Sequence, residues 1–337
     1  MPASSIRHLT SLQDLTDAEL GEVLALSSDL KRVSAAPSLT GRSAGLLFFR
    51  RSLRTRTSFE AAVHQLGGHS VNMNAASDFW ELEARPGVVM DGRAPEHIHD
   101  AAVVLSRYLD VLAIRPALEG QSWEADRRDA SIRAWAEHAE VPVINMESAL
   151  WHPLQALADV MTMRDSLGEL DGKQLTITWS HSPTAASPAV VHSLLLAALR
   201  QGMNVQIAHP AGYELDEGVL ASADDLASSR GRSLTTTRDQ RAAAEGAHVV
   251  YARSWNALGD YGKPSIDASR RARTIDWKVD EDLLALGQDA RLMHAMPVRR
   301  NLEVPDAVLD GERSLVYEQA ENRLHSQKAV LLTLLGR

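Results

Sequence analysis

The sequence has no cysteine, few aromatic residues and no long apolar run. Without cysteine the chain has no disulfide framework, no thiol nucleophile and no cysteine-ligated zinc site. No stretch approaches the roughly 20 apolar residues that cross a bilayer, and the first eight residues lack the apolar core of a signal peptide. We therefore expect a cytoplasmic protein, and 337 residues fit two domains of ordinary size better than one.

Two nucleotide-binding patterns are also absent. The chain contains neither Gly-x-Gly-x-x-Gly nor Gly-x-x-x-x-Gly-Lys-Ser/Thr, which counts against a dinucleotide-dependent oxidoreductase and a P-loop enzyme. The net charge of −9 argues against a nucleic-acid surface, because phosphodiester binding requires clustered basic residues. In this acidic chain, four arginines between positions 50 and 56 form a local positive site for a small anion.

These arginines lie in a strand–turn–helix layout. A short apolar run at 46–49 is followed by a basic, hydroxyl-rich turn, and apolar residues then recur at 59, 62, 63 and 66 with helical spacing. The first N–H groups of a helix have no intrahelical acceptor and can bind an anion. Arg54 and Arg56 can add charge-assisted hydrogen bonds to phosphate, with Ser52, Thr55 and Thr57 as hydroxyl donors. The alternative is an N-cap cluster with solvated arginines.

The rest of the chain alternates strands and helices in two successive halves. In the first half we expect strands at 69–74, 109–114 and 141–145, helices at 16–32, 96–108 and 122–137, and a long loop at 75–94. In the second half we expect strands at 174–179, 205–208, 233–236, 248–251 and 291–294, with helices at 153–164 and 318–335. The pattern predicts an α/β fold of two doubly wound, mostly parallel sheets joined by bridging helices.

Candidate ligand-binding residues follow several of these strands, where open α/β sheets bind ligands. Arg115 directly follows one strand, and taken alone it would be a surface arginine. His152 and Gln155 flank a proline that starts a helix. The alternative to a functional role for His152 is that it only caps this helix. Residues 294–301 follow the strand at 291–294, and Glu-Asn-Arg occupies 321–323. Each of these signals is weak when taken separately.

Together, five segments resemble the carbamoyl-phosphate elements of the aspartate/ornithine carbamoyltransferase superfamily. They are Ser-Leu-Arg-Thr-Arg-Thr at 52–57, Arg115, His-Pro-Leu-Gln at 152–155, His-Ala-Met-Pro at 294–297 and Glu-Asn-Arg at 321–323. The resemblance covers nearly the whole chain. It implies a carbamoyl-phosphate domain at 1–150, an acylornithine domain at 151–317 and a C-terminal helix at 318–337 that returns to the first domain. It also implies a homotrimer with shared active sites, and chemistry without a metal or cofactor.

Within the superfamily the chain is similar to the N-acylornithine branch. The similarity lies in Trp-Glu-Leu-Glu at 80–83, Val-Met-Asp-Gly at 89–92, Asn-Met-Glu at 145–147, Tyr-Ala at 251–252 and Gly-Lys-Pro at 262–264. The Ser-Met-Gly and His-Cys-Leu-Pro segments typical of ornithine carbamoyltransferases are missing. Pro95 resembles the succinyl-preferring members, whereas acetyl-preferring members have glutamate there. A proline leaves room and removes a charge that would repel a succinyl carboxylate.

The resemblance assigns roles to individual residues. The expected catalytic residues are Arg54, Thr55, Arg115, His152 and Gln155. Thr55, Arg115 and His152 would donate to the developing oxyanion. Carbamoyl phosphate would also contact Trp80 from a neighbouring subunit, and its remaining contacts would be Ser52, Leu53, Ala295, Met296 and Arg323. The acylornithine would contact Glu147, Lys263, Met296, Arg299 and Pro95.

Several residues depart from the family pattern. Arg50-Arg51 replaces Asn-Pro or similar, His181-Ser182 lacks the usual proline, Arg253 replaces a common lysine, and Glu303 sits where some relatives have lysine. Glu303 is expected either to pair with Lys263 or to be solvated beside two arginines. The predicted reaction carbamoylates the δ-amine of an Nα-acylornithine, N-succinylornithine in preference to N-acetylornithine. The departures support one alternative, an inactive phosphate-binding homologue.

Overall fold

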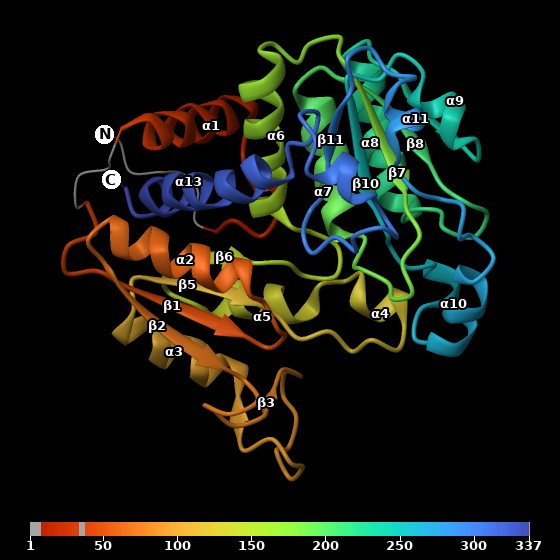
Figure 1. Cartoon of the computed structure of the whole chain (residues 1–337). Coiled ribbons are helices and arrows are strands. Elements are labelled where there is room, and N and C mark those ends of the chain that lie inside the picture. The colour runs from red at the N-terminus through yellow and green to blue at the C-terminus, as the bar shows by residue number, and fades with distance from the viewer. Residues whose placement is uncertain (1–7, 34–37, 337) are drawn as a thin grey trace. The chain divides into compact units, whose positions relative to one another are not determined.

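The structure is a computed structural model that describes residues 8–33 and 38–336 (Figure 1). The chain forms two compact units: the first contains residues 1–119, 126–154 and 322–337, and the second contains 120–125 and 155–321. Each unit is built on a parallel sheet, so the predicted α/β fold class is confirmed. Helices α6 (Pro153–Leu167) and α13 (Val316–Leu334) each contain residues of both units.

The sheet of the first unit has four parallel strands in the order β2-β1-β5-β6. Their bounds are Ser43–Phe48 for β1, His69–Asn74 for β2, Val111–Arg115 for β5 and Val143–Asn145 for β6. The chain reverses its direction of travel across the sheet between β1 and β5, where Phe48 is paired with Arg115. A ligand site is expected at such a switch point, beyond the carboxyl ends of the strands.

Helices cover this sheet on opposite faces because the chain reverses direction (Figure 1). Helix α2 (Arg54–Gln65) buries Phe59, Ala62 and Val63, as the helical spacing predicts. Helices α3 (Ile98–Tyr108) and α5 (Ala130–His138) join β5 in an apolar core that includes Leu112 and Trp135. Helix α1 (Asp17–Arg32) begins with a capping box, in which Thr16 and Glu19 each accept a backbone N–H.

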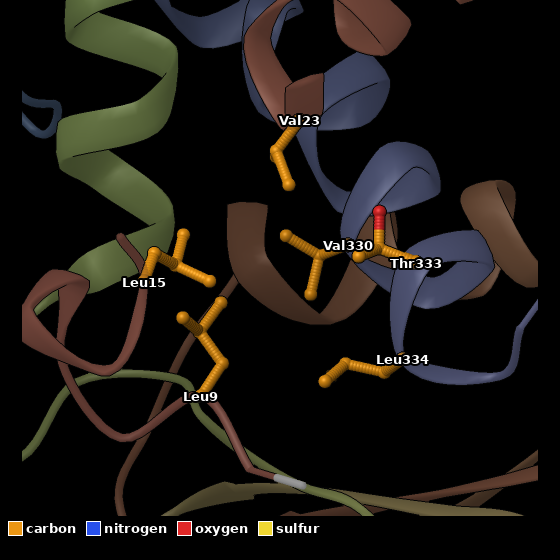
Figure 2. A pocket seen from close by; sticks show the side chains of 6 residues that line it. All are labelled: Leu9, Leu15, Val23, Val330, Thr333 and Leu334. Carbon is orange, nitrogen blue, oxygen red and sulfur yellow. The ribbon is translucent and has the colours of Figure 1, made fainter. Parts of the chain in front are cut away.

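The last part of α13 packs within the first unit. Val330 and Leu334 line a small apolar cavity with Leu9, Leu15 and Val23 (Figure 2). Lys31 Nζ donates to Asn322 Oδ1 at 2.9 Å, which adds a polar contact between α1 and α13. The C-terminal segment is therefore held by contacts with the N-terminal helix.

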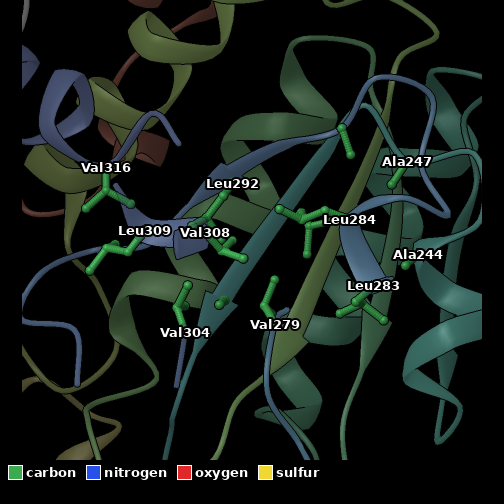
Figure 3. Packing of buried hydrophobic residues seen from close by; sticks show 13 residues of the cluster. Ala244, Ala247, Val279, Leu283, Leu284, Leu292, Val304, Val308, Leu309 and Val316 are labelled. Carbon is green, nitrogen blue, oxygen red and sulfur yellow. The ribbon is translucent and has the colours of Figure 1, made fainter. Parts of the chain in front are cut away.

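The sheet of the second unit has five parallel strands in the order β11-β10-β7-β8-β9. Their bounds are Gln174–Trp179 (β7), Asn204–Ala208 (β8), Leu234–Thr237 (β9), Val249–Arg253 (β10) and Arg291–Met293 (β11). The helices between them are α7 (Ala189–Arg200), α8 (Glu217–Ser229), α9 (Gln240–Ala244), α10 (Pro264–Arg271), α11 (Glu281–Leu284) and α12 (Asp306–Leu309). Leu283, Leu292 and Val308 belong to the apolar core beside β10 and β11 (Figure 3). The switch point lies between β7 and β10.

Two predicted helices differ from the structure. The helix expected over 122–137 is divided into α4 (Trp123–Asp126) and α5, because Asp129 has a φ of 51° that interrupts helical geometry. The helix expected from position 96 begins at Ile98, since Glu96–His97 forms β4 and pairs with β3 (Leu82–Glu83) in the long loop. In the described ranges no helix is long and apolar enough to cross a membrane.

Candidate active site

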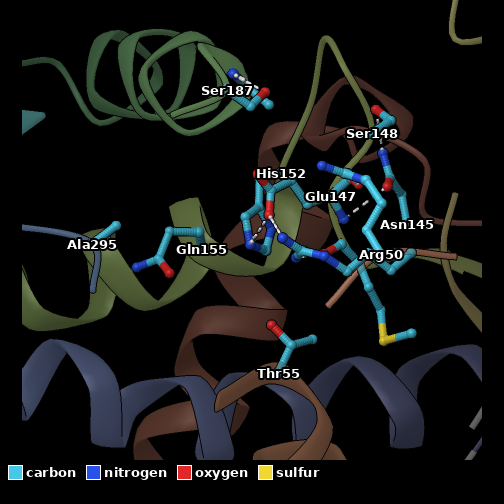
Figure 4. A network of polar contacts seen from close by, with 12 residues as sticks. Arg50, Thr55, Asn145, Glu147, Ser148, His152, Gln155, Ser187 and Ala295 are labelled. Atoms are coloured by element: carbon cyan, nitrogen blue, oxygen red, sulfur yellow. Dashed lines mark hydrogen bonds and ion pairs between the residues drawn. The ribbon is translucent and has the colours of Figure 1, made fainter. Parts of the chain in front are cut away.

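The loop after β1 is fixed by Arg50, which the sequence suggested both as one of four anion-attracting arginines and as a departure from the family pattern. Its Nε donates to the Pro116 carbonyl at 3.1 Å, and its Nη2 donates to the Glu147 carbonyl (Figure 4). These acceptors follow β5 and precede α6, so one guanidinium joins three loops at the carboxyl edge of the first sheet. Arg50 therefore has a positioning role that the sequence pattern did not indicate.

The start of α2 presents the predicted anion-binding group. Leu53 occupies the N-cap, makes no side-chain capping bond and is 74% exposed. Thr55 is buried, and Ser52 and Arg54 are half-buried. Because no side chain caps this end, the first-turn N–H groups are suited to an anion. Arg56 instead stacks over the Phe48 ring at 4.4 Å, so this arginine is engaged in packing.

Arg323 joins α13 to the start of α2. Its Nη2 donates to Thr55 Oγ1 at 3.1 Å, and the residue is only 6% exposed. The contact brings together two of the residues that the family resemblance assigns to phosphate binding. A buried cation beside an uncapped helix start concentrates positive potential at one point.

Arg115, Glu147 and His152 form a buried group at the ends of β5 and β6. Arg115 Nη2 lies 2.5 Å from Glu147 Oε2, and Arg115 Nη1 donates to the Met146 carbonyl at 3.3 Å. His152 Nε2 lies 4.0 Å from the same Glu147 oxygen. Glu147 has a φ of 121°, and its N–H donates to Asn145 Oδ1 at 2.9 Å. The Glu147 carboxylate thus holds Arg115, one of the expected oxyanion donors, and lies near His152, a second one (Figure 4).

Asp129 holds the loop that precedes His152, and no motif indicated it. Its Oδ2 accepts from the Ser148 hydroxyl at 2.6 Å, and its Oδ1 accepts from the N–H groups of Ala149 and Leu150 at 3.0 and 3.2 Å. Burial raises the pKa of the Asp129 carboxyl to about 6, although these hydrogen bonds act to lower it. The folded loop therefore depends on a carboxylate in an unfavourable environment.

The loop between β2 and α3 is largely exposed. Trp80 is 71% exposed, and Pro95 is exposed just before β4. His97 Nε2 contacts the Arg85 carbonyl at 3.2 Å, while its Nδ1 accepts from the His99 N–H at 3.1 Å and so caps α3. Within the loop, hydrogen bonds from Arg85 lower the pKa of Glu83 to about 2. The loop also packs on the rest of the unit, because Leu82 lies against the apolar core of the first unit and the Phe79 ring lies 5.5 Å from that of Phe49.

In the second unit, Gln155 is 5% exposed and Ala295 is 3% exposed. The Ala295 carbonyl accepts from Arg253 Nη1 and contacts His294 Nδ1 at 2.9 Å. Arg253, noted as a departure, thus supports the backbone of the segment at 294–297. The Met296–Pro297 peptide bond is cis.

Glu303 contacts His294, so the expectation that it pairs with Lys263 is wrong. Glu303 Oε2 lies 3.3 Å from His294 Nε2 and accepts from the Arg299 N–H at 2.7 Å. Burial acts to raise the pKa of the Glu303 carboxyl, but the His294 contact, the Arg299 N–H and Arg253 outweigh it and lower that pKa. Glu303 is 4% exposed, so it is not a solvated residue either.

Two of the candidate acylornithine residues, Lys263 and Arg299, follow β10 and β11 of the second unit. Arg299 is exposed, and its Nε and Nη2 donate to Ser182 Oγ and Thr184 Oγ1 at 3.0 and 2.9 Å. Lys263 is exposed at the N-cap of α10. Exposed cations of this kind are suited to substrate carboxylates.

Arg271 organises this edge and was missed by the sequence analysis. It is 1% exposed and pairs with Asp267 at 2.8 Å. Its Nη1 donates to the Ser254 hydroxyl at 2.7 Å and to the Ser182 carbonyl at 3.2 Å, and its Nη2 donates to the Trp255 carbonyl at 2.7 Å. One buried guanidinium therefore ties α10 to the loops after β7 and β10.

The chain is thus a two-unit α/β protein whose first unit brings the buried Arg323 to the start of α2. Family models match the chain over residues 7–165, as the carbamoyl-P binding domain of aspartate/ornithine carbamoyltransferase, and over 174–334, as its Asp/Orn binding domain. The chain belongs to the aspartate/ornithine carbamoyltransferase family.

Full-length relatives agree with this assignment. N-acetylornithine carbamoyltransferase of Xanthomonas campestris pv. campestris is 38% identical over 99% of each chain. Ornithine carbamoyltransferase of Synechocystis sp. is 36% identical over 98% of this chain and 97% of its own. A solved acetylornithine transcarbamylase complexed with acetylcitrulline is 38% identical, covers 98% of this chain and 99% of its own, and superposes with a TM-score of 0.95. The predicted similarity to the N-acylornithine branch is confirmed.

Proposed function

We propose that this protein transfers the carbamoyl group of carbamoyl phosphate to the δ-amine of an Nα-acylornithine, giving N-acylcitrulline and phosphate. The observation that carries the proposal is the buried Arg323–Thr55 contact at 3.1 Å, beside the uncapped start of α2. A similar solved enzyme, acetylornithine transcarbamylase, is complexed with acetylcitrulline, a product of this kind.

The phosphate of the donor substrate binds at the start of α2. Ser52 and Thr55 offer hydroxyls, Leu53 offers its N–H, and Arg54 and Arg323 offer charge-assisted hydrogen bonds. Arg50 carries no phosphate role, because its guanidinium is held by two backbone carbonyls. Trp80 completes the site from a neighbouring subunit, for which its 71% exposure leaves it available.

Carbamoyl transfer requires stabilisation of the oxyanion that develops when the amine attacks the carbamoyl carbon. Arg115, His152 and Thr55 donate to this oxyanion, and the Glu147 carboxylate keeps Arg115 in place. Gln155 and the Met296 carbonyl accept from the carbamoyl NH2 group. Phosphate then leaves and takes the amine proton, since no described side chain is an obvious general base.

We further propose N-succinylornithine as the acceptor substrate. Its additional carboxylate requires a cation, and the exposed side chains of Lys263 and Arg299 in the second unit are the candidates. Solved acetylornithine transcarbamylase variants in which one glutamate is replaced by proline, alanine or serine are complexed with carbamyl phosphate and N-succinyl-L-norvaline. Pro95 of this chain likewise carries no carboxylate. N-acetylornithine is the second candidate, because the most similar named relatives include N-acetylornithine carbamoyltransferases.

The proposed division of labour follows the two units. Residues 1–150 form the domain that binds the phosphate of carbamoyl phosphate, 151–317 form the domain that supplies most contacts to the acylornithine, and 318–337 return to complete the first domain. The contacts of Lys31 with Asn322 and of Arg323 with Thr55 support the last step. Active sites shared within a cytoplasmic homotrimer complete the proposal.

One assay tests the proposed reaction. The purified protein is incubated with carbamoyl phosphate and, in turn, ornithine, N-acetylornithine, N-succinylornithine and aspartate, and ureido product is measured. We expect product with the two acylated ornithines and the higher kcat/KM for the succinyl compound. Binding of carbamoyl phosphate without product from any amine would indicate an inactive homologue instead.

A further inference from the structure

Gln155 is proposed to accept a hydrogen bond from the carbamoyl NH2 group, so the orientation of its carboxamide matters. A carboxamide has an acceptor end and a donor end of nearly equal shape. If it were turned over, it would present N–H donors to the substrate's N–H donors. In the structure, Gln155 Nε2 donates to Asp159 Oδ1 at 2.7 Å, one turn further along α6.

The orientation of the Gln155 carboxamide depends, through Gln319 and Asp159, on a backbone N–H group. The His294 N–H donates to Gln319 Oε1 at 3.0 Å, and a backbone N–H can only donate. The other end of Gln319 is therefore its NH2 group. It donates to Asp159 Oδ1 at 2.7 Å and to Tyr251 Oη at 3.1 Å.

Asp159 links Gln319 to Gln155, because its Oδ1 accepts a hydrogen bond from each of them. It is fully buried, and as a carboxylate it accepts hydrogen bonds but cannot donate them. The Tyr251 hydroxyl donates to Asp159 Oδ2 at 3.0 Å. Burial, followed by the charge of Asp159, raises the pKa of Tyr251 well above its usual value, so the phenol keeps the proton that it donates. Only the N–H end of Gln155 can face such an acceptor.

We propose that Asp159, supported by Tyr251 and Gln319, is a positioning residue that holds the Gln155 carbonyl toward the carbamoyl NH2. The protein would thereby select carbamoyl phosphate over acyl phosphates that lack an NH2 group. The inference rests on the proposed function. Because His294 also begins the segment that carries the Met296 carbonyl, one network positions both proposed acceptors.

The test compares three ligands by calorimetry: carbamoyl phosphate, acetyl phosphate, which has a methyl group in place of NH2, and inorganic phosphate. The wild type should prefer carbamoyl phosphate to acetyl phosphate by about tenfold or more, the value of one hydrogen bond. Asp159→Leu removes the acceptor that orients Gln155. It should lose about tenfold of this preference while its affinity for inorganic phosphate stays within twofold.

Asp159→Asn is the conservative variant. Its carbonyl can still accept from Gln155 and Gln319 while its NH2 faces the Tyr251 oxygen, so the preference should be retained. Thr162→Val is a matched control, because it also removes a buried polar group from α6, a hydroxyl that donates to the Ala158 carbonyl at 2.7 Å. This variant should lose stability and keep the preference.

If Asp159→Leu does not fold, Asp159→Ser serves in its place, since a hydroxyl or an admitted water can donate as well as accept. An unchanged preference in the Leu or Ser variant, or an equal loss in Asp159→Asn, would overturn the positioning role. Ureido product is measured in the same preparations. If the wild type forms ureido product but the variants keep the preference for carbamoyl phosphate, only this inference is contradicted. If the variants lose the preference as expected but the wild type forms no product, only the proposed transfer is contradicted. A wild type that binds no carbamoyl phosphate contradicts both.

Discussion

Arg323 donates a hydrogen bond to Thr55 across 268 positions of the sequence. The C-terminal helix thus places a guanidinium at the start of α2, where the backbone and the Arg54 side chain already favour an anion. Both residues are buried, so the contact lies in a region of weak solvent screening. The proposed phosphate site therefore combines residues from two segments that are far apart in the sequence.

Replacing Arg54 with alanine tests this site. A half-buried guanidinium paired with phosphate contributes charge-assisted hydrogen bonds of about 1.5–3 kcal/mol each. We expect Arg54→Ala to lower carbamoyl-phosphate affinity by at least about tenfold to a hundredfold, measured by calorimetry. Arg107→Ala, which removes an exposed arginine paired with Glu140 at 3.1 Å, is the control and should bind normally. Near-normal affinity of Arg54→Ala would exclude this loop from the site.

Trp80 provides a second prediction, about assembly. At 71% exposure its indole lies outside the core of its own unit, as a residue that serves a neighbouring subunit requires. We expect an oligomer in sedimentation experiments, and a loss of activity in Trp80→Ala without a loss of thermal stability. Mixing Trp80→Ala with an Arg54→Ala variant should restore part of the activity, because some sites then receive both intact residues. Full activity from a monomer at micromolar concentration would contradict the prediction.

Asp129 predicts a pH dependence of stability. Burial raises its pKa in the folded protein to about 6, from 3.8 in the reference state, so the folded chain binds the proton more tightly. Protonation of Asp129 therefore raises the free energy of unfolding as the pH falls from 7 through about 6 toward 4. This contribution is lost again as the pH rises. A shift of roughly two units corresponds to about 3 kcal/mol.

The measurement compares the wild type with Asp129→Asn, which keeps an acceptor for the Ala149 and Leu150 N–H groups but carries no charge. Chemical unfolding is followed at pH 7.5, 6 and 4.5. The wild type should gain stability relative to the variant as the pH falls, because other titrating groups are common to both proteins. Parallel pH profiles would show that the carboxyl titrates normally.

Local sequence patterns were sufficient to predict the two main parallel sheets and the strand–turn–helix layout of β1 and α2. Helical spacing at Phe59, Ala62 and Val63 located α2, and apolar runs located the strands, because both signals involve neighbouring residues. The supporting network could not be predicted in this way. Asp129 contacts Ser148, 19 positions away, and Arg271 contacts Ser182, 89 positions away. No spacing rule connects such pairs before the fold is known.

Glu147 illustrates a different limit. Its segment resembles the N-acylornithine branch, and the resemblance suggests contact with the acylornithine. The structure places its carboxylate 2.5 Å from Arg115, a pairing that could not be inferred because it depends on the positive φ of Glu147 and on the register of β5 and β6. The role of Glu147 toward the acylornithine stays a prediction.

The final prediction concerns the acyl group. If Pro95 admits a succinyl group, a glutamate at this position would place a negative charge near the succinyl carboxylate. At an effective dielectric constant near 20, two like charges about 5 Å apart repel by about 3 kcal/mol, roughly a hundredfold in affinity. Because Pro95 is exposed, screening by water and salt reduces this value, and we expect a loss of at least about tenfold for N-succinylornithine.

N-acetylornithine lacks the second carboxylate, so Pro95→Glu should leave its kcat/KM unchanged or raise it. Pro95→Ala separates the charge from the loss of the proline ring and should retain the succinyl preference. Pro86→Glu, which adds the same charge at another exposed proline of this loop, should affect the two substrates alike. Measuring kcat/KM for both acylornithines in all four proteins decides the question. Equal losses for the two substrates in Pro95→Glu, or a wild type that already prefers the acetyl compound, would rule out Pro95 as the residue that selects a succinyl group.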